Sequence, residues 1–261
     1  MNRIIEREND MAFRKSDGWK YNPEKQFKIS RSSIGSFINC ERCFYLNKVG
    51  NIKDIGMPAF SLNSAHDHLM KKELDVYREK AEPHPYMDGL KRNLIPFQHE
   101  NMEEWRENFK GITYHHEKTN LIITGAVDDV WIDVDTNELI IVEYKSTSTL
   151  KEIDLYDGTP WKEQYRRQID IYQWLFKMNG FKVADESVFL YSNGLKTSKK
   201  FKDVMKFKTY VLEYKGSTDW VEKKILEIKK VLDGKSIPKT NEDCETCSYV
   251  VSVKELEKIN L

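Results

Sequence analysis

A carboxylate and an amine stand two residues apart at the end of an apolar run. Residues 139–142 are Leu-Ile-Ile-Val, and Glu143 and Lys145 follow directly. Because side chains alternate along a strand, Glu143 and Lys145 point to the same face. Charged groups at the end of a buried strand are costly unless they are paired, bound to metal or used in catalysis. Asp128, on the preceding β-rich run, is the natural third member of this group.

Two carboxylates and a lysine are suited to metal-assisted hydrolysis of a phosphodiester. Hard divalent cations prefer carboxylate oxygens, and they activate water and neutralise charge at the phosphate. The pattern alone is weak, because a surface hairpin with a solvated salt bridge has the same residue types.

The elements that must position these residues follow from local patterns. Two β-rich runs flank residues 135–137, Asp-Thr-Asn, which have the composition of a hairpin turn. The second run is apolar throughout, as expected for a strand buried on both faces. Thr159 and Pro160 then predict a helix start, and Gly180 is a suitable residue just past its end.

Gly125-x-x-Asp128 followed by Glu143-x-Lys145 resembles the core of the PD-(D/E)xK nucleases, particularly the RecB-type branch. The resemblance implies that Asp128 and Glu143 hold Mg²⁺ or Mn²⁺. It also implies that Lys145 positions and activates the attacking water.

A second motif lies on the helix predicted over 160–180. Gln168 and Tyr172 are four residues apart and therefore share a face, and Gln164 would extend this polar stripe by one turn. A helix packed on a sheet through Tyr172, with Gln168 in solvent, has the same spacing. The pair resembles the Q-x-x-x-Y motif of RecB-type nucleases. That resemblance implies that both residues position the water or the scissile strand.

RecB-type enzymes also use an upstream histidine on a helix as a metal ligand, in a G-x-x-x-H context. Ser64-x-x-x-His68 preserves this spacing with Ser in place of Gly, which makes His68 the first candidate. His66 and Asp67 are the alternatives, because the three side chains cannot all face the same way on a helix.

The four cysteines form two C-x-x-C pairs near the two ends of the chain. Such pairs are typical of a tetrahedral zinc site or an iron–sulfur cluster, although unligated buried thiols are also common. Some RecB-type nucleases, including helicase–nuclease subunits and CRISPR-associated adaptation exonucleases, join their chain ends with a 4Fe-4S cluster. Their usual division is one cysteine and then three, whereas this chain has two and two, so zinc and iron–sulfur both stay open. The four residues are Cys40, Cys43, Cys244 and Cys247.

A lysine-rich segment connects the two strands predicted after the helix. Lysine plus arginine equals aspartate plus glutamate at 42 each, so any basic surface must be local. The segment is either a solvated hairpin tip or a phosphate-binding ridge, with Phe201 and Phe207, or alternatively Tyr191, available to stack on bases. The candidate nucleic-acid-binding residues are Lys196, Lys199, Lys200 and Lys202.

The order of elements predicts an α/β (α+β) fold with a mixed central sheet flanked by helices and an N-terminal helical region. The resemblance implies that the core is restriction-endonuclease-like. We expect a weakly ordered leader over 1–29, one nuclease domain over 30–250 and a tail over 251–261. Within the domain, the helical part is 30–110, the catalytic core 111–215, and the closing helix and cysteine segment 216–250.

The function implied is a divalent-metal-dependent DNA nuclease, with exonuclease action expected. The alternative is a catalytically inactive nuclease-fold module that binds DNA or a partner and is stabilised by the cysteine site. A redox or zinc-scaffold protein is a second rival, but it leaves the Glu143–Lys145 pair unexplained.

The partners implied are DNA, as single strands or duplex ends, and a helicase, recombination or CRISPR adaptation protein, in DNA repair or recombination. No apolar run has membrane-spanning length and the N-terminus has no signal-peptide pattern, which predicts a soluble, cytoplasmic protein.

Overall fold

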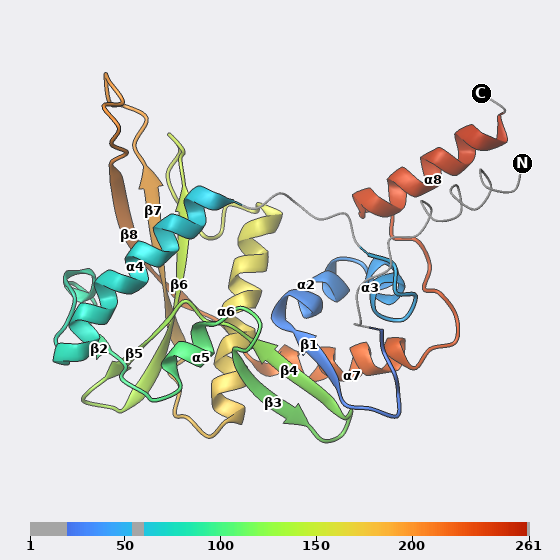
Figure 1. Ribbon diagram of the computed structural model, residues 1–261, viewed down its shortest axis with the longest axis horizontal. Helices are drawn as coiled ribbons and strands as arrows, with labels where there is room; N and C mark the ends of the chain where they lie inside the picture. Colours follow the sequence, from blue (N-terminus) through green and yellow to red (C-terminus); the bar gives the residue numbers. More distant parts are fainter. Residues whose placement is uncertain (1–19, 54–59, 260–261) are drawn as a thin grey trace, which may run out of the picture. The chain divides into compact units, whose positions relative to one another are not determined.

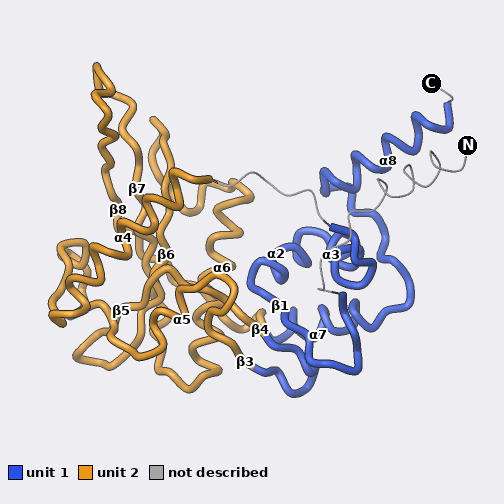
Figure 2. Tube along the Cα trace, in the orientation of Figure 1, with its two compact units in different colours: residues 1–58, 115–122, 222–261 blue, residues 59–114, 123–221 orange. Residues whose placement is uncertain are grey.

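The computed structural model describes residues 20–53 and 60–259, which fall into two compact units. Unit 1 comprises residues 1–58, 115–122 and 222–261, and unit 2 comprises residues 59–114 and 123–221 (Figure 2). The first and last parts of the chain thus belong to unit 1, and most of the middle belongs to unit 2.

Unit 2 is built on a five-stranded mixed sheet with the strand order β2-β5-β6-β7-β8 (Figure 1). β6 and β7 are parallel, and the other neighbouring strands are antiparallel. The predicted α/β class with a mixed central sheet and flanking helices is confirmed. The strands are β2 Leu94–Pro96, β5 Asp129–Asp133, β6 Glu138–Thr147, β7 Glu186–Gly194 and β8 Phe207–Lys215.

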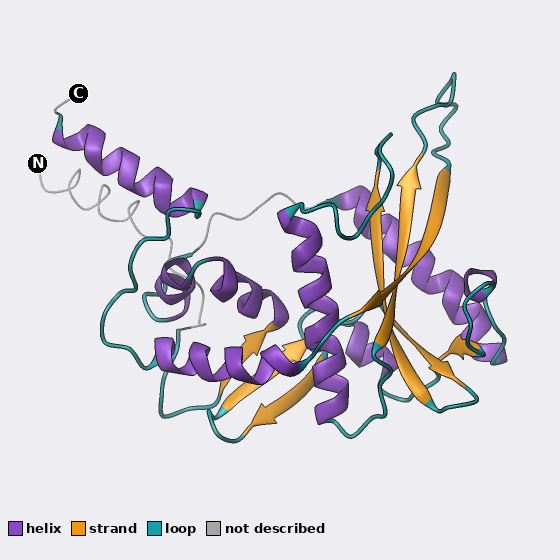
Figure 3. Ribbon diagram, turned by 180° about the vertical axis from the view of Figure 1, so that it is seen from behind, coloured by secondary structure: helices purple, strands orange, loops and turns teal. Residues whose placement is uncertain are grey.

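β6 is the middle strand of this sheet, and its first half is buried on both faces. The side chains of residues 139–142 are at most 3% exposed, as their apolar run predicts. On one face, Ile140 packs with Leu74 of α4 (Ser61–Lys80). On the other face, Ile169 of α6 (Pro160–Met178) packs with Phe189. Helices therefore cover both faces of the sheet (Figure 3).

The ends of α6 follow the sequence signals. Thr159 is the N-cap residue and Pro160 is the first helical residue, as predicted. The Thr159 hydroxyl does not cap the helix, because it donates to Asp157 Oδ1 at 2.6 Å. Gly180, just past the C-cap residue, has φ +84°, a left-handed conformation that glycine adopts without strain.

A buried ionic network ties α4 to the sheet. Arg78 of α4 donates a short hydrogen bond to Asp129 Oδ1 at the start of β5, and neither side chain is more than 8% exposed. The Tyr144 hydroxyl donates to Asp129 Oδ2 at 2.7 Å. Asp75, one turn before Arg78, accepts from Arg78 at 3.0 Å and from Arg106 at 2.9 and 3.0 Å. Every charged group in this network is therefore paired.

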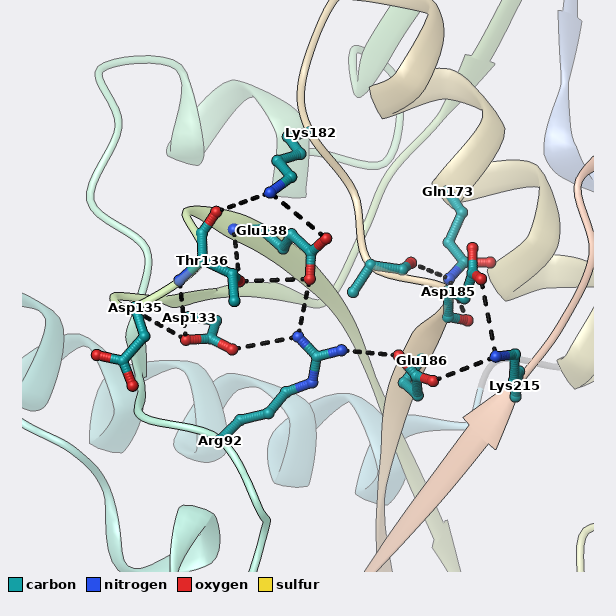
Figure 4. A network of polar contacts seen from close by, with 11 residues as sticks. Arg92, Asp133, Asp135, Thr136, Glu138, Gln173, Lys182, Asp185, Glu186 and Lys215 are labelled. Carbon is teal, nitrogen blue, oxygen red and sulfur yellow. Dashed lines mark hydrogen bonds and ion pairs between the residues drawn. The ribbon is translucent and has the colours of Figure 1, made fainter.

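A second network lies at the start of β6, at the other end of that strand from Lys145 (Figure 4). Arg92 lies 3.2 Å from Asp133, 3.0 Å from Glu138 and 2.8 Å from Glu186. One guanidinium thus joins the segment before β2 to the β5–β6 turn and to the start of β7.

Apart from η1, α5 and the first three residues of α7, the remaining helices belong to unit 1, as does the turn end of the β3–β4 hairpin, residues 115–122. β1, β4 and β3 form a three-stranded sheet in that order. None of the described helices in either unit is long and apolar enough to cross a bilayer. The elements are β1 Phe27–Ser30, α2 Arg31–Asn39, α3 Glu41–Lys48, β3 Ile112–His116, β4 Leu121–Gly125, α7 Asp219–Leu232 and α8 Glu245–Lys258. The short helices η1 Pro85–Met87 and α5 Met102–Arg106 belong to unit 2.

The structure differs from the expected domain layout at several places. Most of the predicted leader, residues 1–19, lies outside the described residues, but β1 begins inside it because Phe27 and Ile29 alternate into the core. Residues 251–258 of the predicted tail belong to α8. The stretch 30–250, expected as one domain, contributes to both units. Cys40, whose backbone is extended at φ −161°, separates α2 from α3.

Removing the cation of the α4 network tests its role in stability. Arg78→Leu leaves Asp129 buried without its ion-pair partner, so it should lower the free energy of unfolding by about 3–5 kcal/mol. Lys215→Met removes exposed ion pairs with Asp185 and Glu186 in the same sheet and should cost at most about 1 kcal/mol. Urea denaturation of the two variants measures both values. Equal, small losses would contradict the structural role of Arg78.

Candidate active site and cysteine centre

Asp128 lies in the short connection between β4 and β5, immediately before β5 begins. Its Oδ2 accepts a hydrogen bond from the backbone N–H of Tyr144 at 2.8 Å. Its Oδ1 lies 3.8 Å from Nζ of Lys71 on α4. Burial, and then the negative charge of Glu143, raises the pKa of the Asp128 carboxyl well above its usual range. Two carboxylates close together in a partly desolvated site are what a divalent cation would stabilise.

Glu143 on β6 is almost completely buried, with 3% of its side chain exposed. Its Oε1 accepts from Lys145 Nζ at 2.5 Å and from Gln168 Nε2 at 2.7 Å. Its Oε2 is buried and has no hydrogen-bond partner among the described residues. A buried carboxylate oxygen without a partner raises the free energy of the folded protein. A bound ligand such as a cation would remove this cost.

Lys145 is held in place by groups from two elements. Besides Glu143, its ammonium lies 3.3 Å from Gln168 Oε1 and 4.3 Å from the centre of the Tyr165 ring. The direct Lys145–Glu143 bond confirms that these two side chains share a face of β6. Tyr165 was missed in the sequence, where Gln164 was the expected extension of the stripe. Gln164 is exposed, whereas Tyr165, three residues before Gln168, faces the lysine.

Gln168 and Tyr172 lie on the buried face of α6, as their spacing predicts. Gln168 Nε2 donates to the Tyr172 hydroxyl at 3.0 Å as well as to Glu143, so the amide connects the helix to the strand. The Tyr172 ring packs against Gly125 at the end of β4. A Cβ atom on Gly125 would lie 2.5 Å from Tyr172 Cε1, closer than van der Waals contact allows. The glycine of the G-x-x-D motif thus makes room for the tyrosine of the helix.

The structure does not bring His68 to the carboxylates. Met70 and Leu74 set the buried stripe of α4, and His68 lies on its exposed side. His66 is half-buried beside Phe207, with ring centroids 5.3 Å apart. Of the three candidates, only Asp67 is connected to Asp128. Its Oδ2 accepts from Lys71 Nζ at 2.9 Å, and that ammonium also faces Asp128.

The four cysteines come together in unit 1. Their sulfur atoms all lie within 4.8 Å of one another, and they form the only group of three or more potential His, Cys, Asp or Glu ligands found at this spacing in residues 20–53 and 60–259. The two C-x-x-C pairs have similar positions, because each begins immediately before a helix, α3 or α8, and ends in its first turn. Burial raises the pKa of the Cys40 and Cys43 thiols. The sulfur–sulfur distances are 3.6 Å for Cys40–Cys247, 3.6 Å for Cys43–Cys244 and 3.8 Å for Cys43–Cys247.

The lysine-rich segment forms the end of the β7–β8 hairpin, which projects beyond the neighbouring strands (Figure 1). Lys202 and Asp203 at its tip have φ +48° and +57°. Phe201 is 67% exposed, whereas Tyr191 is buried at 5%, so only Phe201 and Phe207 present rings to solvent here. The four predicted lysines, Lys196, Lys199, Lys200 and Lys202, are all exposed.

Comparison with known proteins identifies the class. A sequence model of the PD-(D/E)XK nuclease superfamily matches residues 28–252, so the chain belongs to this superfamily. The match spans the carboxylate–lysine group, the α6 motif and all four cysteines.

Solved structures and curated proteins add little to this assignment. The crystal structure of SSO0001 has 16% identity, covers 96% of this chain and 93% of its own, and gives a TM-score of 0.34. A protein from Eubacterium rectale described as a putative exonuclease has 13% identity, covers 91% of this chain and 94% of its own, and gives a TM-score of 0.42. No protein of curated function matches the chain. The assignment to the superfamily therefore rests on the match to the family model.

Proposed function

We propose that the protein is a divalent-metal-dependent nuclease that hydrolyses phosphodiester bonds in DNA. The observation that carries the proposal is the buried, unpartnered Oε2 of Glu143, which lies in the same site as Asp128. Asp128 and Glu143 would hold Mg²⁺ or Mn²⁺, for which carboxylate oxygens are the preferred donors. When bound, such a cation activates water and neutralises charge on the phosphate.

Lys145 is the residue best placed to act on the attacking water. An ammonium group has three protons to donate. Glu143 and Gln168 take two of them in this structure, which leaves the third for a water or a phosphate oxygen. The side-chain amide of Gln168 is hydrogen-bonded to Glu143, Lys145 and Tyr172. Its role is therefore to fix the position of the Glu143 carboxylate relative to the Lys145 ammonium.

Exonuclease action, single-stranded or duplex ends as substrate, and a helicase, recombination or CRISPR adaptation partner stay predictions from the resemblance to RecB-type enzymes. The rival proposal of an inactive DNA-binding module predicts that the carboxylates and the lysine no longer form one closely packed group. The close association of Glu143, Lys145 and Gln168 favours the active enzyme.

Substituting either carboxylate tests the nuclease directly. Asp128→Asn and Glu143→Gln should each reduce cleavage by about 100-fold or more, because each removes a negative charge that the cation requires. Gln164→Ala, an exposed change on α6, should leave the rate unchanged. The assay follows end-labelled single-stranded, duplex and circular DNA with Mg²⁺ or Mn²⁺. Carboxylate variants that cut at the parent rate in excess Mg²⁺ would refute the site.

We also propose that the exposed lysines of the β7–β8 hairpin bind DNA phosphates. Neutralising Lys199, Lys200 and Lys202 to Gln in a Glu143→Gln background should weaken binding to any sequence. The slope of log K against log salt should fall by about 2, since each phosphate contact on single strands contributes about 0.7. A matched triple change of the exposed Lys91, Lys182 and Lys215 should leave the slope unchanged. If the two triple variants have the same slope, the hairpin lysines do not bind DNA phosphates and the hairpin is only a solvated surface.

We infer that the four cysteines bind one zinc ion rather than a 4Fe-4S cluster. Zinc–sulfur bonds of about 2.3 Å in a tetrahedron place the sulfur atoms about 3.8 Å apart. Three of the six sulfur–sulfur distances are 3.6–3.8 Å and all six are within 4.8 Å, which supports this choice. In a four-iron cluster each thiolate binds a different iron atom, so the sulfur atoms lie farther apart.

Metal analysis of the purified protein should therefore find about one zinc per chain and no absorption band near 400 nm. Cys40→Ser or Cys247→Ser should lower the free energy of unfolding by several kcal/mol, since zinc binding stabilises the native state. The matched control is Ser36→Ala, an exposed change in the neighbouring helix α2. A brown protein that contains iron would refute zinc, and a protein with neither metal would refute the centre.

A further inference from the structure

We propose that Lys71 is a further catalytic residue of this site, which binds the scissile phosphate from the α4 side of the sheet. This proposal rests on the nuclease function proposed above. In the structure, Lys71 Nζ lies between two carboxylates, 2.9 Å from Asp67 Oδ2 and 3.8 Å from Asp128 Oδ1. Lys71 is 20% exposed, so its ammonium can reach both the interior of the site and solvent.

The two oxygens of Asp128 are not equivalent. Oδ2 is occupied by the backbone N–H of Tyr144, so Oδ1 is the oxygen left for a cation. Oδ1 is also the oxygen that Lys71 faces. A divalent cation and an ammonium repel each other, and both cannot stay close to one carboxylate oxygen. Cation binding at Asp128 should therefore move the Lys71 ammonium away from Oδ1.

Asp67 determines where the ammonium goes. It is four residues before Lys71 on α4, and it is more exposed than Asp128, at 35% against 22%. An ammonium that leaves Asp128 but keeps its bond to Asp67 moves toward the open side of the site. Asp128 and Glu143 would hold the cation, and a phosphate that enters from the open side would meet the Lys71 ammonium there.

Lys71 and Lys145 would then contact the phosphate from two directions. Lys145 extends from the face of β6 that α6 covers, and Lys71 extends from α4 on the other side. The phosphate gains negative charge as water attacks, and a second ammonium stabilises that charge. Lys71 donates a hydrogen bond to a non-bridging oxygen and stays protonated, so it takes no part in proton transfer.

This arrangement predicts effects of opposite sign on cation binding and cleavage. Lys71→Gln removes a positive charge that competes for Asp128, so Mn²⁺ should bind several-fold more tightly to the DNA-free protein. The same change removes a phosphate contact, so single-turnover cleavage at saturating Mn²⁺ and DNA should fall by about 10- to 100-fold. Lys71→Arg keeps the charge and should retain most of the cleavage.

The adjacent Lys72 provides the matched control, because it is exposed on the same turn of α4. Lys72→Gln should change neither Mn²⁺ affinity nor cleavage. Calorimetric titration measures the Mn²⁺ affinity of each variant, and thermal unfolding measures its stability. Parent-like cleavage by Lys71→Gln at saturating Mn²⁺ would overturn the proposal. A joint loss of Mn²⁺ affinity and thermal stability would also overturn it, since Lys71 would then be a structural ion-pair partner.

The same titrations separate this proposal from the nuclease assignment. If Glu143→Gln leaves the Mn²⁺ affinity of the parent unchanged, the cation site itself is wrong, and both proposals fail. If Glu143→Gln abolishes Mn²⁺ binding but Lys71→Gln does not tighten it, only the role of Lys71 fails.

Discussion

The buried ion pair between Arg78 and Asp129 is the constraint on which the arrangement of the candidate active site depends. Asp129 is held from one side by Arg78 of α4 and from the other by the hydroxyl of Tyr144. The backbone N–H of Tyr144 in turn holds Asp128, the neighbour of Asp129 in sequence. One network therefore fixes the distance between α4 and β6 and the orientation of the first carboxylate. Lys71 and Asp67, two and three turns earlier on α4, reach the site because this pair holds the helix there.

The protein's own groups do not fully balance the polar atoms of the candidate site. One carboxylate oxygen of Glu143 accepts two hydrogen bonds, from Lys145 and Gln168. The other oxygen has no hydrogen-bond partner among the described residues. An apolar or fully paired arrangement would give a more stable protein at this position, since a buried unpaired oxygen costs free energy. Functional sites commonly keep such unfavourable groups and depend on the surrounding fold for stability. Here the fully paired Arg78 network supplies that support.

Much of the site could be predicted from the sequence because it depends on short-range periodicity. The two-residue spacing placed Glu143 and Lys145 on one face, and the four-residue spacing placed Gln168 beside Tyr172. The third group could not be predicted, because the choice among His66, Asp67 and His68 depends on how α4 is rotated against the sheet. That rotation is set by Met70, Leu74 and the Arg78 pair. The division into two units also escaped prediction, since it depends on contacts between distant segments.

The position of the cysteines has a consequence for how the chain is completed during synthesis. Unit 2 lies between the first and last segments of unit 1 in the sequence, and residues 115–122 of unit 1 interrupt it once. All residues of unit 2 precede Cys244. A ribosome therefore synthesises the whole of unit 2 before the second C-x-x-C pair exists. Cys40 and Cys43 are made early and must wait for their partners about 200 residues later, a delay of about 10–40 s at bacterial and eukaryotic elongation rates. Unit 2, which contains the candidate active site, can thus form before the centre that joins the first and last segments of unit 1.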